Sequence, residues 1–349
     1  MRSDVIQFLS NSAVITSSIF ISLFARELGA SNLQVGIIGA SYGIAIFISS
    51  ILFGRASDLF GRRVFMQLGL GLCTLSFLLQ VLATDVLSLT LIRFLAGFTL
   101  GIFTAPLIAY AFETGSSMGR FSSLGALGWA LGNVVAGIIA VYSDLFALSS
   151  LFFFIAFLTS LRMKEFPTVK VSLPIFPRAV LRRNSKVYFT YFLRHLGASS
   201  VWTIFPLFLA SIGASKFWIG IIYLANSGTQ FIIMRFVDRF EEVKLMRVGV
   251  ILSVVVFASY AFASDYRQII PIQLLLAASW SCLYVGSLLF LVRRNEERAT
   301  SVGILNSVIS IASVIGPLLG GLISEAFGYT AVMYFAVALS FLGFLISAE

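Results

Sequence analysis

Long apolar segments recur along the whole chain and are separated by short polar loops. Of the 349 residues, 59% are hydrophobic and 11% are charged, whereas soluble domains carry about 25% charged residues. A helix needs about 20 mostly apolar residues to cross a bilayer, and only helices and closed barrels satisfy their backbone groups there. The pattern therefore predicts an all-α polytopic membrane protein.

The apolar runs and their breaks predict twelve transmembrane spans, six between residues 5 and 161 and six between residues 187 and 347. The second span is expected over residues 33–53. The longest polar interval, which holds Pro167, Pro174 and Pro177, lies between the two sets. We therefore expect an N-terminal six-helix bundle over residues 1–163, a basic cytoplasmic linker over residues 164–186, and a C-terminal six-helix bundle over residues 187–349.

Basic residues cluster in alternate loops. The N-terminal tail, the loops after even-numbered spans and the linker hold 19 of the 24 Lys and Arg residues, the opposite loops hold three, and two lie inside spans. The positive-inside rule then places both termini in the cytoplasm, and we expect the protein in the plasma membrane. This distribution explains the net charge of +9 without a nucleic-acid partner. The basic linker is expected either to lie on membrane lipids or to be a solvated tether.

The two halves of the sequence repeat one another. Short motifs of the first half return in the second: Gly29 with Gly213 at an offset of 184, Arg55 with Arg235 at 180, and Arg120 with Arg298 at 178. The matched loops keep both residue type and order, which favours parallel repeats related by an axis along the membrane normal. The alternative is chance similarity between apolar helices.

A polar segment interrupts the apolar pattern at residues 54–63, with the sequence Gly-Arg-Ala-Ser-Asp-Leu-Phe-Gly-Arg-Arg. Gly54 is expected to end the second span, and Gly61 to supply the dihedral angles of a short reversal. The charges of this segment compensate one another, since Asp58 lies among Arg55, Arg62 and Arg63. The plain alternative is a topology anchor that only fixes orientation.

The segment resembles the signature loop of the major facilitator superfamily of secondary transporters. The resemblance implies two pseudo-symmetric six-helix bundles and transport by alternating access, with a small-molecule substrate, a coupling proton, no cofactor, no enzymatic activity and a monomeric state. It also implies a second gating contact between Glu113 and Arg120. The residues that it assigns to a cytoplasmic gate motif are Gly54, Arg55, Asp58, Gly61, Arg62 and Arg63.

Arg93 lies inside the fourth span, where a charge costs at least a few kcal/mol. Gly97 and Gly101 follow at one-turn intervals and form a face on which two helices can approach closely. The pattern is similar to the superfamily's fourth-span motif, which implies a role for the arginine in proton coupling or substrate charge, although Ala96 replaces a residue that is often polar there. The alternative is an arginine that reaches the lipid headgroups.

Arg194 and His195 lie together in the seventh span, and His195 is the only histidine of the chain. At the offset of 184, His195 corresponds to Asn11 in the first span. Both helix faces are predicted to line a central cavity between the halves, with a polar packing seam as the alternative. The further residues predicted to line this cavity, besides Arg93, are Trp202, Asn226, Gln230, Tyr284 and Asn306.

The intramembrane charges favour a small organic anion as the substrate. The alternative is proton-coupled efflux of lipophilic drug-like compounds, which the many aromatic residues favour; Asn133 weakens it, because it replaces the proline of a motif found in drug antiporters. A receptor or channel is a more distant alternative. The sequence has no Walker loop and no metal-ligand spacing, and Cys73 and Cys282 lie far apart, so no cofactor, metal or disulfide is expected.

Overall fold

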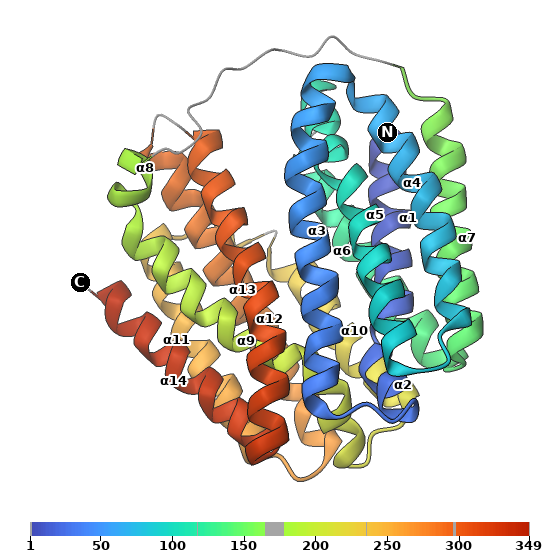
Figure 1. Cartoon of the computed structure of the whole chain (residues 1–349). Helices are drawn as coiled ribbons and strands as arrows, with labels where there is room; N and C mark the ends of the chain where they lie inside the picture. Colours follow the sequence, from blue (N-terminus) through green and yellow to red (C-terminus); the bar gives the residue numbers. More distant parts are fainter. Residues whose placement is uncertain (1, 117, 165–177, 235, 296–297, 349) are drawn as a thin grey trace. The chain divides into compact units, whose positions relative to one another are not determined.

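The computed structural model describes residues 2–116, 118–164, 178–234, 236–295 and 298–348 (Figure 1). Helices supply the regular secondary structure of these residues. The chain divides into two compact units. Unit 1 comprises Met1–Ser172 and Ser215–Leu224, and unit 2 comprises Leu173–Ala214 and Ala225–Glu349.

Unit 1 contains the helices of the first half of the chain. Within it, α1 packs against α6 and α7, α4 packs against α5 and α7, and α3 packs against α5. Aromatic rings of Phe77, Phe103 and Phe153 meet in its core. The helices are α1 (Arg2–Ser18), α2 (Ile21–Glu27), α3 (Asn32–Phe60), α4 (Arg62–Leu78) with the short 3-10 helix η1 (Leu79–Leu82), α5 (Val86–Glu113), α6 (Met118–Ile139) and α7 (Tyr142–Leu161).

Unit 2 repeats this packing. In it, α9 packs against α13 and α14, and α11 packs against α12 and α14. In this packing, α9 takes the place that α1 has in unit 1, and α11 takes the place of α4. The correspondence agrees with the repeat seen in the sequence. The elements of the second half of the chain are α8 (Arg178–Arg183), α9 (Ser185–Ser211), α10 (Lys216–Ile233), η2 (Val237–Arg239), α11 (Glu242–Ala261), α12 (Tyr266–Arg294), α13 (Arg298–Phe327) and α14 (Tyr329–Ala348). Of these, α10 belongs to unit 1 as far as Leu224 and to unit 2 from Ala225.

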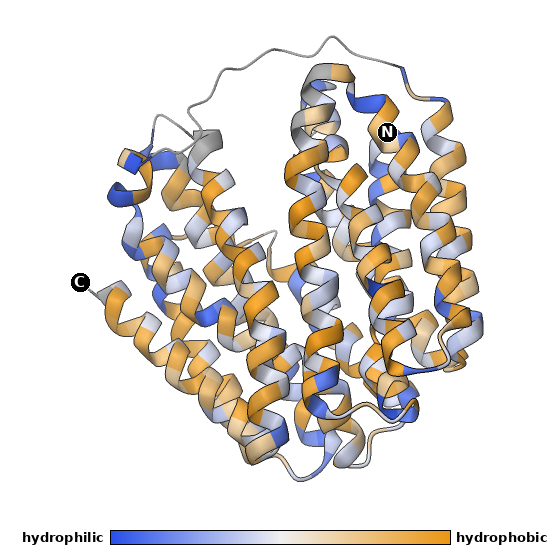
Figure 2. Ribbon diagram, in the orientation of Figure 1, coloured by the Kyte–Doolittle hydropathy of each residue, from blue (hydrophilic) through white to orange (hydrophobic). Residues whose placement is uncertain are grey.

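The helices have the length and apolar surface of membrane spans. Nine segments of the described residues are long and apolar enough to cross a membrane, with α1 and α2 together forming the first. Helices α6, α9 and α10 lie where the fifth, seventh and eighth spans are expected. Figure 2 shows apolar residues along the helix bodies and hydrophilic residues gathered near many helix ends. Side chains such as Leu87 and Ile138 are exposed, as lipid contact requires, and the prediction of a polytopic helical membrane protein is confirmed.

The second span differs from its prediction. Helix α3 does not end at residue 53 but continues to Phe60, so Gly54 lies inside it. The apolar pattern marks only the part of a helix that faces lipid, and here the helix extends beyond that part with polar residues. Gly61 alone separates α3 from α4, with a φ of 100°, and its predicted role in the reversal is confirmed.

Two helix starts follow directly from the local sequence. Ser31 caps α3 through its side chain, and Gln34 completes a capping box. Before α5, the Asp85 carboxylate accepts hydrogen bonds from the backbone N–H groups of Leu87 and Ser88. The hydrogen bond from Ser88 is the main cause that lowers the pKa of the Asp85 carboxyl. These caps satisfy donors that the first helical turn leaves without partners.

Glycines allow the closest helix approaches in both units. A Cβ at Gly132 in α6 would lie 2.8 Å from the Ser12 carbonyl oxygen of α1, and one at Gly320 in α13 would lie 2.2 Å from the Ser200 carbonyl oxygen of α9. Both members of the contact are displaced by the same offset of 188, from Gly132 to Gly320 and from Ser12 to Ser200. The same contact is therefore built twice, once in each unit.

This register corrects the correspondence of His195 with Asn11. At the offset of 188, His195 corresponds to Gln7. The loop after this span, which holds Gly29 and Gly213, repeats at an offset of 184. The two offsets differ by four positions, which is about one helical turn. The extra turn lies in the first span, where Ile19 and Phe20 separate α1 from α2, whereas α9 is continuous.

The glycine contact predicts a matched pair of stability effects. Gly320→Ala places a methyl group against the backbone of α9, so we expect it to lower the free energy of unfolding by about 1–3 kcal/mol. Gly303→Ala in the same helix meets nothing within 4 Å, and helix propensity should make it neutral or stabilising by roughly 0.5–1 kcal/mol. Thermal unfolding in mild detergent measures both variants. Equal midpoints would show that the close contact of Gly320 with α9 does not contribute to stability.

Candidate functional site

A buried ion pair joins the start of α4 to the end of α5. The Arg62 guanidinium donates to Glu113 Oε1 at 3.0 Å and to Ser57 Oγ at 2.9 Å. The exposed fractions of the Arg62 and Glu113 side chains are 9% and 19%. The neighbouring Arg63 donates to the Leu161 carbonyl at the end of α7, at 3.1 Å. Two of the predicted gate residues thus tie three helix ends together.

Unit 2 holds the same pair with the charges reversed. Glu242 begins α11 and accepts from Arg293 at 3.1 Å and from Arg294 at 3.2 Å, both at the end of α12. Glu242 corresponds to Arg62, and Arg293 to Glu113, at the same offset of 180 that relates the polar segment of the first half to its copy in the second. The acid and the base have exchanged helices while the contact has been kept.

Other contacts between the same helices confirm this register. The glycine at the closest approach of these helices recurs at the offset of 180, as Gly69 against Phe103 and as Gly249 against Leu283. The small polar pair deeper in the helices recurs at the same offset, as Cys73 with Thr99 and as Ser253 with Ser279. The reversed ion pair therefore lies at equivalent positions and does not result from a shifted alignment.

The remaining predicted gate contacts have mixed outcomes. Glu113, expected to pair with Arg120, has Arg62 as a partner, and Arg120 lies 3.6 Å from Asp4 of α1. The side chains of Arg55 and Asp58 lie outside the described residues. Their role in a gate stays a prediction.

The predicted small-residue face of Arg93 is confirmed within unit 1. A Cβ at Gly97 would lie 2.4 Å from the Tyr42 carbonyl oxygen, and one at Gly101 would lie 2.7 Å from the Ile46 carbonyl oxygen. Helix α5 therefore approaches α3 directly after Arg93, and the spacing of the two glycines explains why the helices can touch.

Arg93 itself is buried in unit 1, with an exposed fraction of 4%. Its guanidinium lies 3.9 Å above the Tyr42 ring and donates to Gln80 Oε1 at 3.2 Å and to Ser18 Oγ at 3.4 Å. No carboxylate of the described residues is within ion-pair distance. Neutral oxygens and one aromatic face thus compensate its charge. Sequence reasoning missed Tyr42 and Gln80, which lie on other helices.

Arg194 forms a second buried cationic centre, in unit 2. Its exposed fraction is 1%. Its Nε donates to Ser253 Oγ at 2.8 Å, while Nη2 has no hydrogen-bond partner in the part of the chain that is described. The guanidinium also lies near the rings of Phe257 and Trp280, at 5.7 Å and 5.4 Å. As at Arg93, the described residues offer no carboxylate.

His195 and a group of aromatic rings adjoin Arg194. His195 Nε2 lies 3.1 Å from Ser313 Oγ, and Nδ1 has no partner among the described atoms. The His195 ring contacts those of Tyr191 and Trp280, and Trp280 stacks on Tyr284 at an interplanar angle of 5°. We call Tyr191, Arg194, His195, Trp280 and Tyr284 the arginine–aromatic cluster.

The other cavity candidates have partners of their own. Asn11 accepts from Trp129 Nε1 at 2.7 Å, and Trp202 packs on Phe205. Gln230 donates to Asn226 Oδ1 at 2.6 Å, and Asn226 donates to the Gln273 carbonyl at 3.2 Å. The Asn306 side chain is exposed. The structure therefore brings together Arg194, His195 and Tyr284 of the predicted set, and a cavity lined by both halves stays a prediction.

Comparison with known proteins identifies the class. The sequence model of the Major Facilitator Superfamily matches residues 5–184 and 187–348. The chain therefore belongs to the major facilitator superfamily, and it is a membrane-spanning transporter.

Its relatives within the superfamily are distant. The quinolone resistance protein NorA of Staphylococcus aureus is 23% identical over 346 residues, covering 93% of this chain and 89% of NorA. An uncharacterized MFS-type transporter of Methanocaldococcus jannaschii, MJ1560, is 30% identical over 144 residues, which cover 39% of this chain and 36% of that protein.

Solved structures show the same fold. A variant of the nucleoside transporter NupG has a TM-score of 0.84 at 14% identity, covering 99% of this chain and 98% of that one. The human organic anion transporter MFSD10 has a TM-score of 0.72 at 17% identity, with 99% and 97% covered.

The reversed ion pair predicts that a charge exchange is tolerated in unit 1. Glu113→Arg alone sets two cations against each other and should lower stability by about 1.5–3 kcal/mol. The double variant Arg62→Glu, Glu113→Arg recreates the order found in unit 2 and should recover at least half of that loss. Thermal unfolding in detergent measures both variants. A double variant no more stable than Glu113→Arg would show that the pair does not act as an ion pair.

Proposed function

We propose that this transporter carries a small organic anion by secondary active transport with alternating access, and that Arg194 contacts the anion. The observation that supports the proposal most strongly is the Arg194 guanidinium, which is buried with one nitrogen unpaired and no carboxylate nearby among the described residues. It lies in a segment expected to be surrounded by lipid.

A buried charge without a counterion is costly, and proteins place one in a membrane chiefly where function requires it. The ring faces of Phe257 and Trp280 offset only part of the cost. A carboxylate or phosphate of the substrate would supply the missing negative charge and accept hydrogen bonds from the N–H groups of Nη2. The stacked pair Trp280 and Tyr284 would bind an apolar or aromatic portion of the same substrate.

His195 is the residue that we propose to carry the coupling proton. Its Nδ1 is unpartnered among the described atoms and its Nε2 faces a hydroxyl, so both nitrogens can accommodate a change of protonation state. Histidine can exist as a neutral or a protonated ring, and burial beside the Arg194 charge disfavours the protonated form unless an anion is bound as well. A proton on His195 adds a positive charge next to Arg194, which would strengthen anion binding and link it to the proton gradient.

Efflux of lipophilic compounds is the second candidate function. Its specific support is the similarity to NorA, a quinolone resistance protein, over 93% of this chain. On this alternative, the aromatic rings of the cluster bind an apolar compound, and Arg194 has a structural role.

A ligand panel separates the two functions. A ligand that binds only the folded state stabilises it by about 2.7 kcal/mol at a hundredfold excess over its Kd. We expect aromatic carboxylates to raise the unfolding midpoint of the wild-type protein, and Arg194→Gln to abolish this shift. Arg194→Lys should retain part of it, because it keeps the charge. Arg93→Gln removes the buried arginine of unit 1 and tests in the same assay whether this predicted cavity residue also contributes to the shift. Stabilisation by lipophilic cations alone, unchanged in Arg194→Gln, would favour efflux.

The gate motif predicts a transport defect without a folding defect. Asp58→Asn removes the only acidic group of residues 54–63, so it should slow uptake of a transported anion into proteoliposomes by at least roughly tenfold, or about 1.4 kcal/mol. Its expression and membrane insertion should match the wild type. Asp85→Asn, on a helix cap in a polar loop, is the control. Wild-type rates in Asp58→Asn would leave the segment as a topology anchor.

A further inference from the structure

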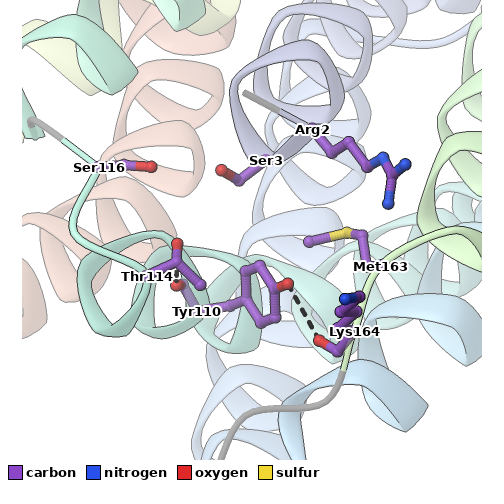
Figure 3. A pocket seen from close by; sticks show the side chains of 7 residues that line it. All are labelled: Arg2, Ser3, Tyr110, Thr114, Ser116, Met163 and Lys164. Carbon is purple, nitrogen blue, oxygen red and sulfur yellow. Dashed lines mark hydrogen bonds between the residues drawn. The ribbon is translucent and has the colours of Figure 1, made fainter.

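A small polar cavity lies in unit 1 where α1 begins and where α5 and α7 end (Figure 3). Its volume is about 270 Å³, below the size usual for drug-like ligands but several times that of a water molecule. Six of its lining residues are polar: Arg2, Ser3, Tyr110, Thr114, Ser116 and Lys164. No function considered above uses this cavity.

The charge at the cavity is positive. Arg2 and Lys164 both line it, and the first turn of the 17-residue helix α1 adds backbone N–H groups and the positive end of a helix dipole. Of the nearby acids among the described residues, Asp4 lies 3.6 Å from Arg120 and Glu113 bonds to Arg62. Because both carboxylates have basic partners, the two cations of the cavity remain available to an anion.

The walls of the cavity are held in place by hydrogen bonds. The Tyr110 hydroxyl donates to the Lys164 carbonyl at 3.0 Å, and the Arg2 guanidinium donates to the Arg162 carbonyl. Thr114 donates its hydroxyl to the Tyr110 carbonyl at 2.8 Å. The chain after α7 is thus fixed against α1 and α5, and the arrangement does not depend on a ligand.

One hydroxyl points to a ligand independently of the charges. Ser3 has an exposed fraction of 3% and makes no hydrogen bond to a described residue. In Figure 3 its hydroxyl points toward the side chains of Thr114 and Ser116. Because Ser3 lines the cavity, its hydroxyl opens into it and can donate a hydrogen bond to a ligand oxygen.

We propose that this cavity binds a phosphate group, presented by an anionic lipid headgroup or by a soluble phosphorylated compound. Phosphate offers more acceptor oxygens than a carboxylate, and these match two cations, the Ser3 hydroxyl and the first N–H groups of α1. The cavity lies at the ends of three helices, the level at which lipid phosphates meet a membrane protein.

The test uses the full chain in detergent with two probes. Native mass spectrometry measures retention of phosphatidylglycerol against phosphatidylcholine, and thermal unfolding measures the affinity for pyrophosphate. In the double variant Arg2→Gln, Lys164→Gln, we expect the affinity for the binding probe to fall at least roughly tenfold, and in Ser3→Ala about threefold. Retained phosphatidylglycerol with no effect of pyrophosphate identifies a lipid site, and the converse identifies a soluble ligand.

The control is Arg162→Gln, which removes one charge from the same end of unit 1 without altering the lining of the cavity. It should leave both affinities within about twofold of the wild type if net charge is not the cause. Unliganded unfolding midpoints show whether the variants fold, and Ser3→Ala gives a test in a variant with both cations intact. Wild-type affinity in the double variant, an equal loss in Arg162→Gln, or binding of neither probe would overturn the proposal.

Discussion

Polar groups in the membrane-spanning part of this protein must find their partners inside the protein, because lipid offers none. The rest of the structure follows from that constraint. Ion pairs close the ends of α4 and α5 and of α11 and α12, and small hydroxyl pairs join the same helices deeper in each unit. Arg93 and Arg194 meet the same constraint without a carboxylate from the described residues, since neutral oxygens and aromatic faces are their partners.

The internal repeat separates contacts that recur with the same residue type from contacts that recur with different residues. Close contacts between helices recur at fixed offsets, because a backbone carbonyl can be approached only where a side chain is absent. Charges recur as pairs, but their order differs, as Arg62 with Glu113 and Glu242 with Arg293 show. The helix dipoles favour the order of unit 2, which has the acid at the start of α11 and the base at the end of α12. The opposite order in unit 1 is therefore held by the attraction between Arg62 and Glu113 and by the hydrogen bond to Ser57.

The two proposed binding sites, the arginine–aromatic cluster and the polar cavity at Arg2 and Lys164, lie in different units. The cluster lies within the helix bodies of unit 2, where burial strengthens any interaction with an anion. The cavity lies at the helix ends of unit 1, where the surroundings are polar and a ligand arrives from the headgroup region or from water. Binding at the second place does not depend on transport through the first, so each proposal can fail without the other.

The sequence by itself determined the helical membrane class, the two-half organisation and the family, because span length, charge asymmetry and the motif at residues 54–63 are local properties of the chain. It also singled out Arg93, Arg194 and His195, since any charge in an apolar run is visible without a structure. Only the tertiary structure decided the partners of these residues, such as Tyr42 from another helix. It also corrected the end of the second span and the correspondence of His195, because helix length beyond the lipid and one extra turn in the first span leave no mark in an apolar pattern.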